Sequence, residues 1–394
     1  MIHQFEINGM NMVLDVNSGA VHVLDPEAAN VLSCYEDGSP VSEKMEKLEE
    51  LYGKKLISEI RSEIDGLIAD GLLFTDNPHE EMLEKIKGSK VVKALCLHIA
   101  HDCNLRCKYC FAGEGNYSGE KSIMPVEVGL KAIDFVIANS GNRKNIEIDF
   151  FGGEPLLNLE TVKAIVDYAR EKEKACNKHF RFTITTNGLL LDEETTEYLN
   201  NTMDNIVLSL DGRREINDRM RARKDGSGTY DAILPKFKKL VLKRGDKDYY
   251  VRGTFTSYNL DFSNDVMHMA DSGFDQVSVE PAVLKDGTGF EIKKEHLKTI
   301  FSEYEKLALK LHERKKHGKE VNFFHFIIDL EGGPCVIKRL RGCGSGCEYL
   351  AVTPEGDLFP CHQFVNVKEF KIGSVFTGID RPEIVDRFTE INVF

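Results

Sequence analysis

Apolar residues in the first 75 positions follow a strand pattern and then a helix pattern. Two apolar-rich segments, 2–7 and 10–16, are separated by Asn8-Gly9, a dipeptide typical of a two-residue hairpin turn. A third short strand is predicted over 20–24. Apolar residues then recur at helical spacing, which predicts one helix from Asp25-Pro26, one over 42–52 and one over 57–68.

Strands followed by three short helices predict a small winged-helix-like module over residues 1–75. A charged connector over 76–92 ties this module to the rest of the chain. A DNA-binding winged helix is the alternative, but no Arg/Lys face stands out in the module.

From Lys93 onward, short apolar strands alternate with amphipathic helices. Such repeats imply parallel strands, because each crossover returns the chain to the same end of the sheet. We therefore predict an α/β fold over 93–320, a partial (β/α)6 barrel with functional loops at the carboxyl ends of its strands. The predicted strands are 94–100, 146–151, 180–185, 205–210, 249–255 and 276–280, and the predicted helices are 125–139, 160–173, 193–200, 230–243, 262–272 and 293–317.

The composition limits the classes of function. The chain has 394 residues, 42% of them hydrophobic, and a formal net charge of −13, which argues against a nucleic-acid-binding surface. No stretch has the pattern of a signal peptide or a membrane span, so we expect a cytoplasmic protein without a membrane partner. In that compartment the ten cysteines are expected to be metal ligands or free thiols.

Three of these cysteines, Cys103, Cys107 and Cys110, stand at C-x3-C-x2-C spacing just after strand 94–100. Three thiolates on one loop can hold three irons of a [4Fe–4S] cube and leave the fourth iron open to a small molecule. A structural zinc site is the alternative. It needs a fourth ligand, for which His98 and His101 are near enough in sequence.

The segment 98–112, with Tyr109 before its last cysteine, is followed after the next strand by Gly152-Gly153-Glu154-Pro155. This order resembles the radical S-adenosylmethionine (SAM) superfamily. The segment itself resembles the SCIFF maturases, which install thioether cross-links in short Cys-rich peptides, and the similarity runs over the whole chain. The resemblance implies that a cluster on the three cysteines binds SAM and, when reduced, cleaves it to methionine and a 5′-deoxyadenosyl radical.

The resemblance also implies which residues surround SAM. Gly152 and Gly153 allow close approach of the backbone, and Glu154 fits as a partner nearby. Arg252 interrupts an apolar strand and is costly to bury without an anion, so the family pattern pairs it with the SAM carboxylate; a structural salt bridge is the alternative. The other expected SAM-site residues are Tyr109, Pro155, Asn187, Ser209 and Asp211, although Asn187-Gly188 and Asp211-Gly212 are also ordinary turn dipeptides.

A second group of cysteines lies near the carboxyl end of the chain. Cys343 and Cys361 bracket Gly356 as C-x12-G-x4-C, which resembles the opening of a SPASM domain, an extension that carries auxiliary Fe–S clusters. Cys347 is expected as a third ligand, and residues 355–357 are predicted to turn between strands 349–353 and 358–360. Because no cysteine follows Cys361, either the chain is truncated or the auxiliary site has only these ligands. We favour truncation and interpret 321–394 as a bridging region and an incomplete SPASM domain. The remaining cysteines, Cys34, Cys96, Cys176 and Cys335, are expected to be buried or free thiols.

The function implied by the resemblance is thioether formation between a peptide Cys sulfur and the carbon of an acceptor residue. The expected partners are a Cys-rich precursor peptide, whose leader pairs with a strand edge of the 1–75 module, and an electron donor such as ferredoxin or flavodoxin. Formylglycine formation, epimerisation or a carbon–carbon cross-link would keep the radical chemistry. A non-enzymatic metal-binding adaptor is the alternative from a different class.

Overall fold

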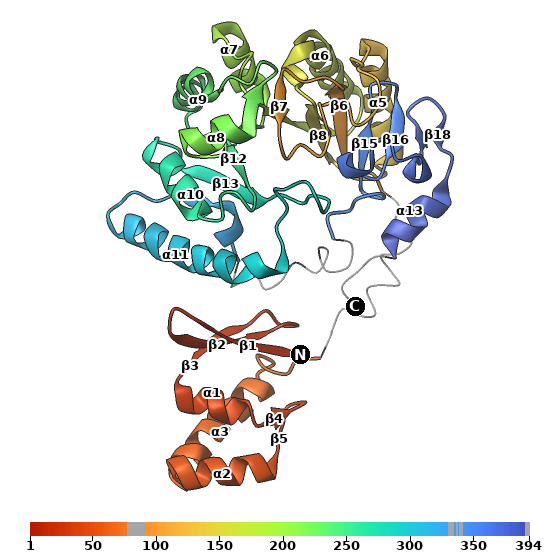
Figure 1. The fold of residues 1–394 in the computed structure, drawn as a ribbon. Coiled ribbons are helices and arrows are strands. Elements are labelled where there is room, and N and C mark those ends of the chain that lie inside the picture. The colour runs from red at the N-terminus through yellow and green to blue at the C-terminus, as the bar shows by residue number, and fades with distance from the viewer. Residues whose placement is uncertain (77–90, 330–334, 336–337, 339–341, 391–394) are drawn as a thin grey trace. The chain divides into compact units, whose positions relative to one another are not determined.

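The computed structural model describes residues 1–76, 91–329, 335, 338 and 342–390. The chain divides into two compact units (Figure 1). One contains residues 1–76 with the described positions between 328 and 338, and the other contains 91–327 and 342–390. Among the described residues, no helix is both long enough and apolar enough to cross a membrane.

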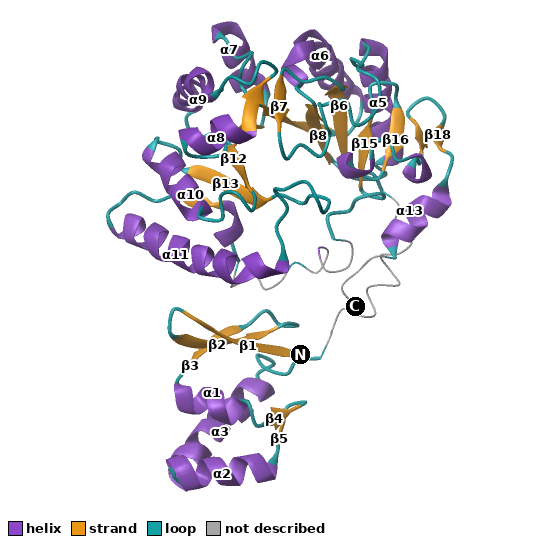
Figure 2. Cartoon of the chain, in the orientation of Figure 1, coloured by secondary structure: helices purple, strands orange, loops and turns teal. Residues whose placement is uncertain are grey.

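The amino-terminal unit begins with a three-stranded antiparallel sheet (Figure 2). Asn8 and Gly9 take positive φ angles of 50° and 74° and join Ile7 to its partner Met10, so the predicted hairpin is confirmed. Its strands, in the order β1-β2-β3, are β1 (Ile2–Ile7), β2 (Met10–Asp15) and β3 (Val21–Leu24).

Three helices follow this sheet, as the apolar spacing predicts. Ile57, Ile60 and Ile64 are buried along one face of the third helix, at the spacing that identified it. The interpretation of the whole unit as winged-helix-like remains a prediction. The helices are α1 (Pro26–Leu32), α2 (Ser42–Tyr52) and α3 (Lys54–Ala69), and two short strands, β4 (Tyr35–Glu36) and β5 (Ser39–Pro40), form a second hairpin.

The second unit is built on a sheet that contains all six predicted parallel strands. They lie side by side in chain order, and each pairs in parallel with the next, so this part of the predicted fold is confirmed. The strands are β6 (Ala94–Ala100), β8 (Asn145–Gly152), β9 (His179–Thr186), β10 (Asn205–Ser209), β12 (Tyr249–Phe255) and β13 (Gln276–Pro281).

A helix follows each of these strands, and the helices lie along the outer side of the curved sheet (Figure 1). Phe150, Phe180 and Phe182 are fully buried in the hydrophobic core with residues of these helices. The helices are α5 (Val126–Asn139), α6 (Leu159–Ala175), α7 (Glu193–Thr202), α9 (Tyr230–Arg244), α10 (Phe262–Asp271) and α11 (Leu297–Lys316). The sequence pattern missed α8 (Arg214–Met220) and the two-stranded ribbon of β7 (Leu105–Cys107) and β11 (Arg221–Arg223).

Within the described residues, the sheet extends beyond the six predicted strands to a total of eleven. The predicted carboxyl-terminal hairpin is confirmed as β15 (Tyr349–Val352) and β16 (Asp357–Phe359), but β15 also pairs in parallel with β6. Among the described residues, the two outermost strands do not pair with each other, so the sheet stays open. The further strands are β14 (Asn322–Phe323), β17 (Gly373–Ser374) and β18 (Gly378–Ile379), and α13 (Pro382–Thr389) follows.

A buried carboxylate closes the amino-terminal unit. Asp15 has no exposed surface and accepts hydrogen bonds from the backbone amide of Ser18 at 2.8 Å and from that of Thr75 at 3.1 Å, while both hydroxyls also donate to it. Burial alone would raise the pKa of Asp15, but these hydrogen bonds outweigh it and lower the pKa below the usual value. The carboxylate therefore ties the end of β2 to the segment that leaves α3.

The stability of this unit should depend on the ionised form of Asp15. A lowered pKa in the folded state gives stability that is present above the unfolded pKa, near 4, and is lost as the pH falls through the folded pKa. Asp15→Asn should lower the free energy of unfolding of this unit by about 1–3 kcal/mol at pH 7. Urea unfolding at pH 7 and at pH 3 measures this, and the difference from wild type should shrink at pH 3. Asp37→Asn, at an exposed turn, is the matched control; equal losses in both variants would contradict the role of Asp15.

Candidate functional site

The three clustered cysteines open into one cavity at the carboxyl ends of the strands. Cys103, Cys107 and Cys110 all line it, and its volume is about 510 Å³. Strands β8, β9, β10, β12 and β13 contribute the opposite walls through residues at or near their carboxyl ends. Of the other predicted SAM-site residues, those that line the same cavity are Tyr109, Gly152, Gly153, Glu154, Asn187, Ser209 and Arg252.

The environment of the thiols suits an iron–sulfur cluster. Burial raises the pKa of Cys103 and Cys107 to about 11 and also raises that of Cys110, so the thiols are protonated until a metal displaces their protons. In a [4Fe–4S] cluster each thiolate binds a different iron, so its ligands stand farther apart than those of a single ion. A cavity lined by three thiols fits that arrangement.

The zinc alternative finds no such support. Within the described part of the chain, no three His, Cys, Asp or Glu side chains gather closely enough to hold a single metal ion. His98 and His101, the two candidate fourth ligands, are buried, and His98 Nδ1 lies 3.0 Å from His101 Nε2. Each ring therefore directs a nitrogen at the other, and neither residue lines the cavity.

The two glycines at the end of β8 are needed for contact with the cysteine loop. A Cβ on Gly153 would lie 2.1 Å from the carbonyl oxygen of Asp102, and a Cβ on Gly152 would lie 2.4 Å from that of Ala100. Gly152 also has a φ of 117°, which other residues rarely adopt. Their close approach is therefore to the protein backbone at the start of the loop, a role that the sequence interpretation did not include.

Glu154 is almost completely buried, and its carboxylate is held by the end of the neighbouring strand. It accepts hydrogen bonds from the Thr186 hydroxyl and the Asn187 amide, both at 2.8 Å, and from the Leu156 amide at 3.1 Å. Burial raises the pKa of Glu154 despite these donors. The neighbouring Pro155 is buried at the start of a short 3-10 helix, η1 (Pro155–Asn158), and does not line the cavity.

Asn187 joins this group to the cysteine loop. Its side-chain amide donates to Asn104 Oδ1 at 2.7 Å and lies 3.7 Å from Cys103 Sγ. The loop is therefore held by the ends of both β8 and β9.

A buried polar triad fixes the other end of the loop. The Tyr109 hydroxyl donates to the Asp211 carboxylate at 2.8 Å and accepts a hydrogen bond from Arg221 Nη1 at 2.7 Å. Asp211 also accepts from the Thr254 amide at 3.1 Å. Asp211 was predicted as a SAM contact, but it does not line the cavity; it binds the loop through Tyr109.

Arg221 was missed by the sequence analysis. It begins β11, which pairs with β7 so that Arg221 stands opposite Cys107, and both residues line the cavity. No local pattern marks Arg221, because its partners Tyr109 and Asp211 are distant in sequence.

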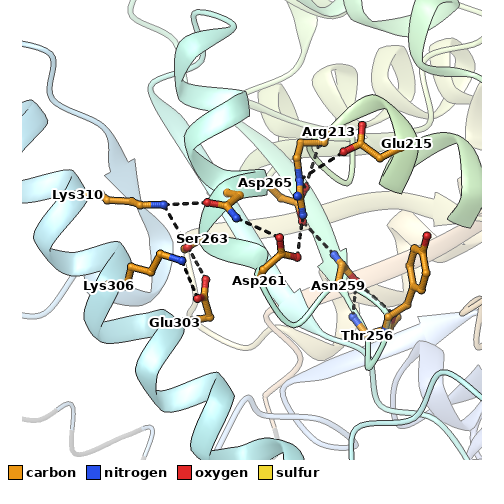
Figure 3. Close-up of polar contacts among 12 residues, drawn as sticks. Arg213, Glu215, Thr256, Asn259, Asp261, Ser263, Asp265, Glu303, Lys306 and Lys310 are labelled. Atoms are coloured by element: carbon orange, nitrogen blue, oxygen red, sulfur yellow. Dashed lines mark hydrogen bonds and ion pairs between the residues drawn. The ribbon is translucent and has the colours of Figure 1, made fainter.

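Arg213, two residues after Asp211, belongs to an ionic network that anchors this turn (Figure 3). Arg213 Nε donates to the buried carboxylate of Asp265 at 2.7 Å, and Arg213 Nη2 donates to Asp261 at 2.8 Å. Asn259 donates to the other Asp265 oxygen at 3.1 Å, and Lys310 on α11 reaches Asn264 at 2.9 Å. The network connects the end of β10 to α10 and α11.

The structure corrects the argument for Arg252. Its side chain is 55% exposed, so no buried charge requires an anion there. Arg252 lies on the face of β12 that lines the cavity, and its Nη2 is 3.9 Å from Glu280 Oε1. An exposed arginine on a cavity wall can still bind an anion. The argument that a buried arginine needs an anion, however, does not apply to Arg252.

The carboxyl-terminal cysteines are not gathered like those of the loop. Cys343 is exposed, whereas Cys347 is buried in the hydrophobic core with its Sγ 3.5 Å from the Gly344 carbonyl oxygen. Cys361 precedes His362 and Gln363, which both line the cavity and were also missed by the sequence analysis. Of this group, Cys361 is therefore the cysteine that the chain brings next to the cavity.

Comparisons with known proteins agree with this geometry. The sequence model of the radical SAM superfamily matches residues 97–250. An uncharacterized protein of Methanocaldococcus jannaschii, MJ0907, is 32% identical over 56% of this chain and 71% of its own length. The radical SAM cyclopropyl synthase TigE of Paramaledivibacter caminithermalis is 29% identical over 49% of this chain, which spans only 42% of that relative.

A similar fold has been solved for SuiB of Streptococcus suis bound to the precursor peptide SuiA. The TM-score is 0.56 at 16% identity, and the match covers all of this chain and 88% of that one. This likeness concerns the fold. Together with the matches in sequence and the three thiols on one cavity, it leads to one conclusion: the chain belongs to the radical SAM superfamily, whose members bind a [4Fe–4S] cluster and SAM.

Proposed function

We propose that this protein modifies a ribosomally made, Cys-rich peptide by forming a thioether between a Cys sulfur and the carbon of an acceptor residue. One observation carries the proposal. The residues that follow Cys361 line the same cavity as Cys103, Cys107 and Cys110. A peptide in that cavity would lie between the loop that holds SAM and a second cysteine that can hold the sulfur partner.

In this proposal Cys103, Cys107 and Cys110 hold the [4Fe–4S] cluster. When bound, the reduced cluster and SAM together supply a 5′-deoxyadenosyl radical that takes hydrogen from carbon. The residues of the chain position the cysteine loop and SAM. Tyr109, Asp211, Glu154 and Asn187 hold the loop against the ends of three strands, and Ser209 and Arg252 line the wall available to SAM.

Cys343 and Cys361 are proposed as ligands of an auxiliary Fe–S cluster. Such a cluster would hold the deprotonated substrate sulfur and would accept the one electron released when the carbon radical and the thiolate form the C–S bond. The β15–β16 hairpin lies between them and is fixed to the core sheet through β6, which gives this site a rigid frame. Cys347 is left out of the set because its side chain lies in the hydrophobic core.

The amino-terminal unit is proposed to recognise the leader of the peptide by adding it as a strand to the β1-β2-β3 sheet. Both β1 and β3 are edge strands of that sheet, and Val21 and Val23 of β3 are exposed. Recognition of a precursor peptide is supported by the SuiB structure, whose bound SuiA is such a peptide. A one-electron donor of the ferredoxin or flavodoxin kind completes the partners.

The first test replaces Cys103, Cys107 and Cys110 together by Ala. We expect no 5′-deoxyadenosine, because without thiolates there is no cluster to reduce SAM. Product chromatography after dithionite reduction measures this, and iron content and visible absorption report the loss of the cluster. Undiminished deoxyadenosine from the triple variant would refute the assignment.

The second test removes residues 1–75. SAM cleavage without peptide should persist, because the cavity is built entirely by the second unit. The affinity for the leader-bearing precursor should fall, whereas that for the same peptide without its leader should not change. Equal affinity for the full precursor with and without the module would remove the recognition role.

The third test changes Cys343 or Cys361 to Ala. Deoxyadenosine should still form, because neither residue lies on the SAM-binding loop, while cross-linked peptide should fall about 10- to 100-fold or more. Mass spectrometry after thiol alkylation counts thioethers, since each one removes two hydrogens and one alkylation site. Cys176→Ala, which removes a partly exposed thiol outside the cavity, is the control. Normal cross-linking in the Cys361 variant would exclude an auxiliary cluster from the reaction.

A further inference from the structure

The ribbon that carries Cys107 is rich in basic residues. Its two strands with their flanks, residues 105–108 and 219–224, hold ten residues, of which six are Arg or Lys and none is Asp or Glu. The antiparallel pairing of β7 with β11 brings the two segments together. The chain as a whole has a formal net charge of −13, whereas these two segments carry a net positive charge.

Part of this charge faces solvent. Lys108, Arg219 and Lys224 are exposed, and Lys121 joins them from the next loop, because Lys121 and Lys224 both lie near Asp102. Among the described residues, Lys108 and Arg219 have no carboxylate within ion-pair distance. Instead, Lys108 Nζ lies 5.8 Å from the ring centre of Phe290, and Arg219 Cζ lies 3.7 Å from that of Tyr258.

The same ribbon also carries one of the proposed cluster ligands. Cys107 of β7 stands directly opposite Arg221 of β11, and both line the cavity. Lys108, Arg219 and Lys224 do not line this cavity, although Lys108 directly follows Cys107 in the chain. A protein bound to these exposed side chains would therefore lie close to the loop that holds the proposed cluster.

We propose that the exposed basic side chains of the β7–β11 ribbon form the docking surface for a small acidic protein that carries a low-potential one-electron group. The inference rests on the proposed function, because a cluster on Cys103, Cys107 and Cys110 must receive an electron from outside. Complementary charge steers association of such partners and holds them in register. Attraction between exposed charges is screened beyond about 10 Å at 0.1 M salt, so docking should weaken as salt increases.

The test reverses the charge of the ribbon in the full chain, by Lys108→Glu, Arg219→Glu and Lys224→Glu together. Lys315→Glu, Lys316→Glu and Lys319→Glu, at and just after the exposed carboxyl end of α11, change the net charge equally and serve as the control. The probe is flavodoxin, an acidic flavin protein, in its fully reduced form. A second ribbon variant has Gln at the three positions. It removes the positive charges without adding negative ones, so it tests the proposal if the Glu variant does not fold.

Two measurements decide the proposal. With flavodoxin at low salt, the ribbon variants should produce deoxyadenosine about 10-fold more slowly or worse than wild type and the control, and the dependence of the rate on salt should flatten. With dithionite, a small reductant that needs no docking, all four proteins should match. Titration should show that wild type and the control bind flavodoxin more tightly than the two ribbon variants do.

Equal flavodoxin affinity and equal flavodoxin-driven rates in wild type and the ribbon variants would overturn the docking surface. Failure of wild type to cleave SAM with dithionite would instead overturn the proposed function. In that case the comparison of affinities would still decide whether the ribbon binds the carrier.

Discussion

The site depends on one buried carboxylate that joins a loop to the end of a sheet. Asp211 is almost completely buried, and a buried charge without partners would be very costly, so it must keep its hydrogen bonds to Tyr109 and to the Thr254 amide. Burial raises the pKa of Asp211 to about 6, while Arg221 and these donors oppose the increase. Because Tyr109 sits between two cysteines of the loop, satisfying Asp211 also fixes the positions of the thiols.

The rest of the fold supports this contact from two sides. On one side, Arg213 holds the turn against α10 through Asp265. On the other side, Glu154 and Asn187 fix the opposite end of the cysteine loop, and the glycines at the end of β8 allow the two backbones to come into contact. The three thiols are therefore placed by three strand ends that are adjacent only because the strands are parallel, which is the general reason that such sheets bind ligands at their carboxyl edges.

One face of the parallel sheet packs against the helices, and the other face lines the cavity. The outer face packs Phe and Ile side chains against helices and supplies most of the hydrophobic core. The inner face carries polar side chains, such as Ser209, Arg252 and Glu280, which meet the cavity. β15 pairs with β6, and the segment after β16 brings His362 and Gln363 to the same cavity, so a single sheet connects the loop of the first strand to Cys361.

The amino-acid sequence by itself determined the features that depend on near neighbours along the chain. The Asn8-Gly9 hairpin, the six strands and helices of the second unit and the spacing of Cys103, Cys107 and Cys110 all follow from local periodicity, turn chemistry and ligand geometry. The same local reasoning failed at Arg252, because alternation along a strand shows which residues share a face but not whether that face borders a cavity.

Only the tertiary structure decided the contacts between distant residues. Arg221 meets Tyr109 across 112 positions, and the basic ribbon exists only because β11 pairs with β7. Likewise, Asp211 binds the loop and not the cavity wall. The physical reason is that these contacts require the ends of separate strands to converge, and convergence depends on the order and curvature of the whole sheet, which no short segment of sequence encodes.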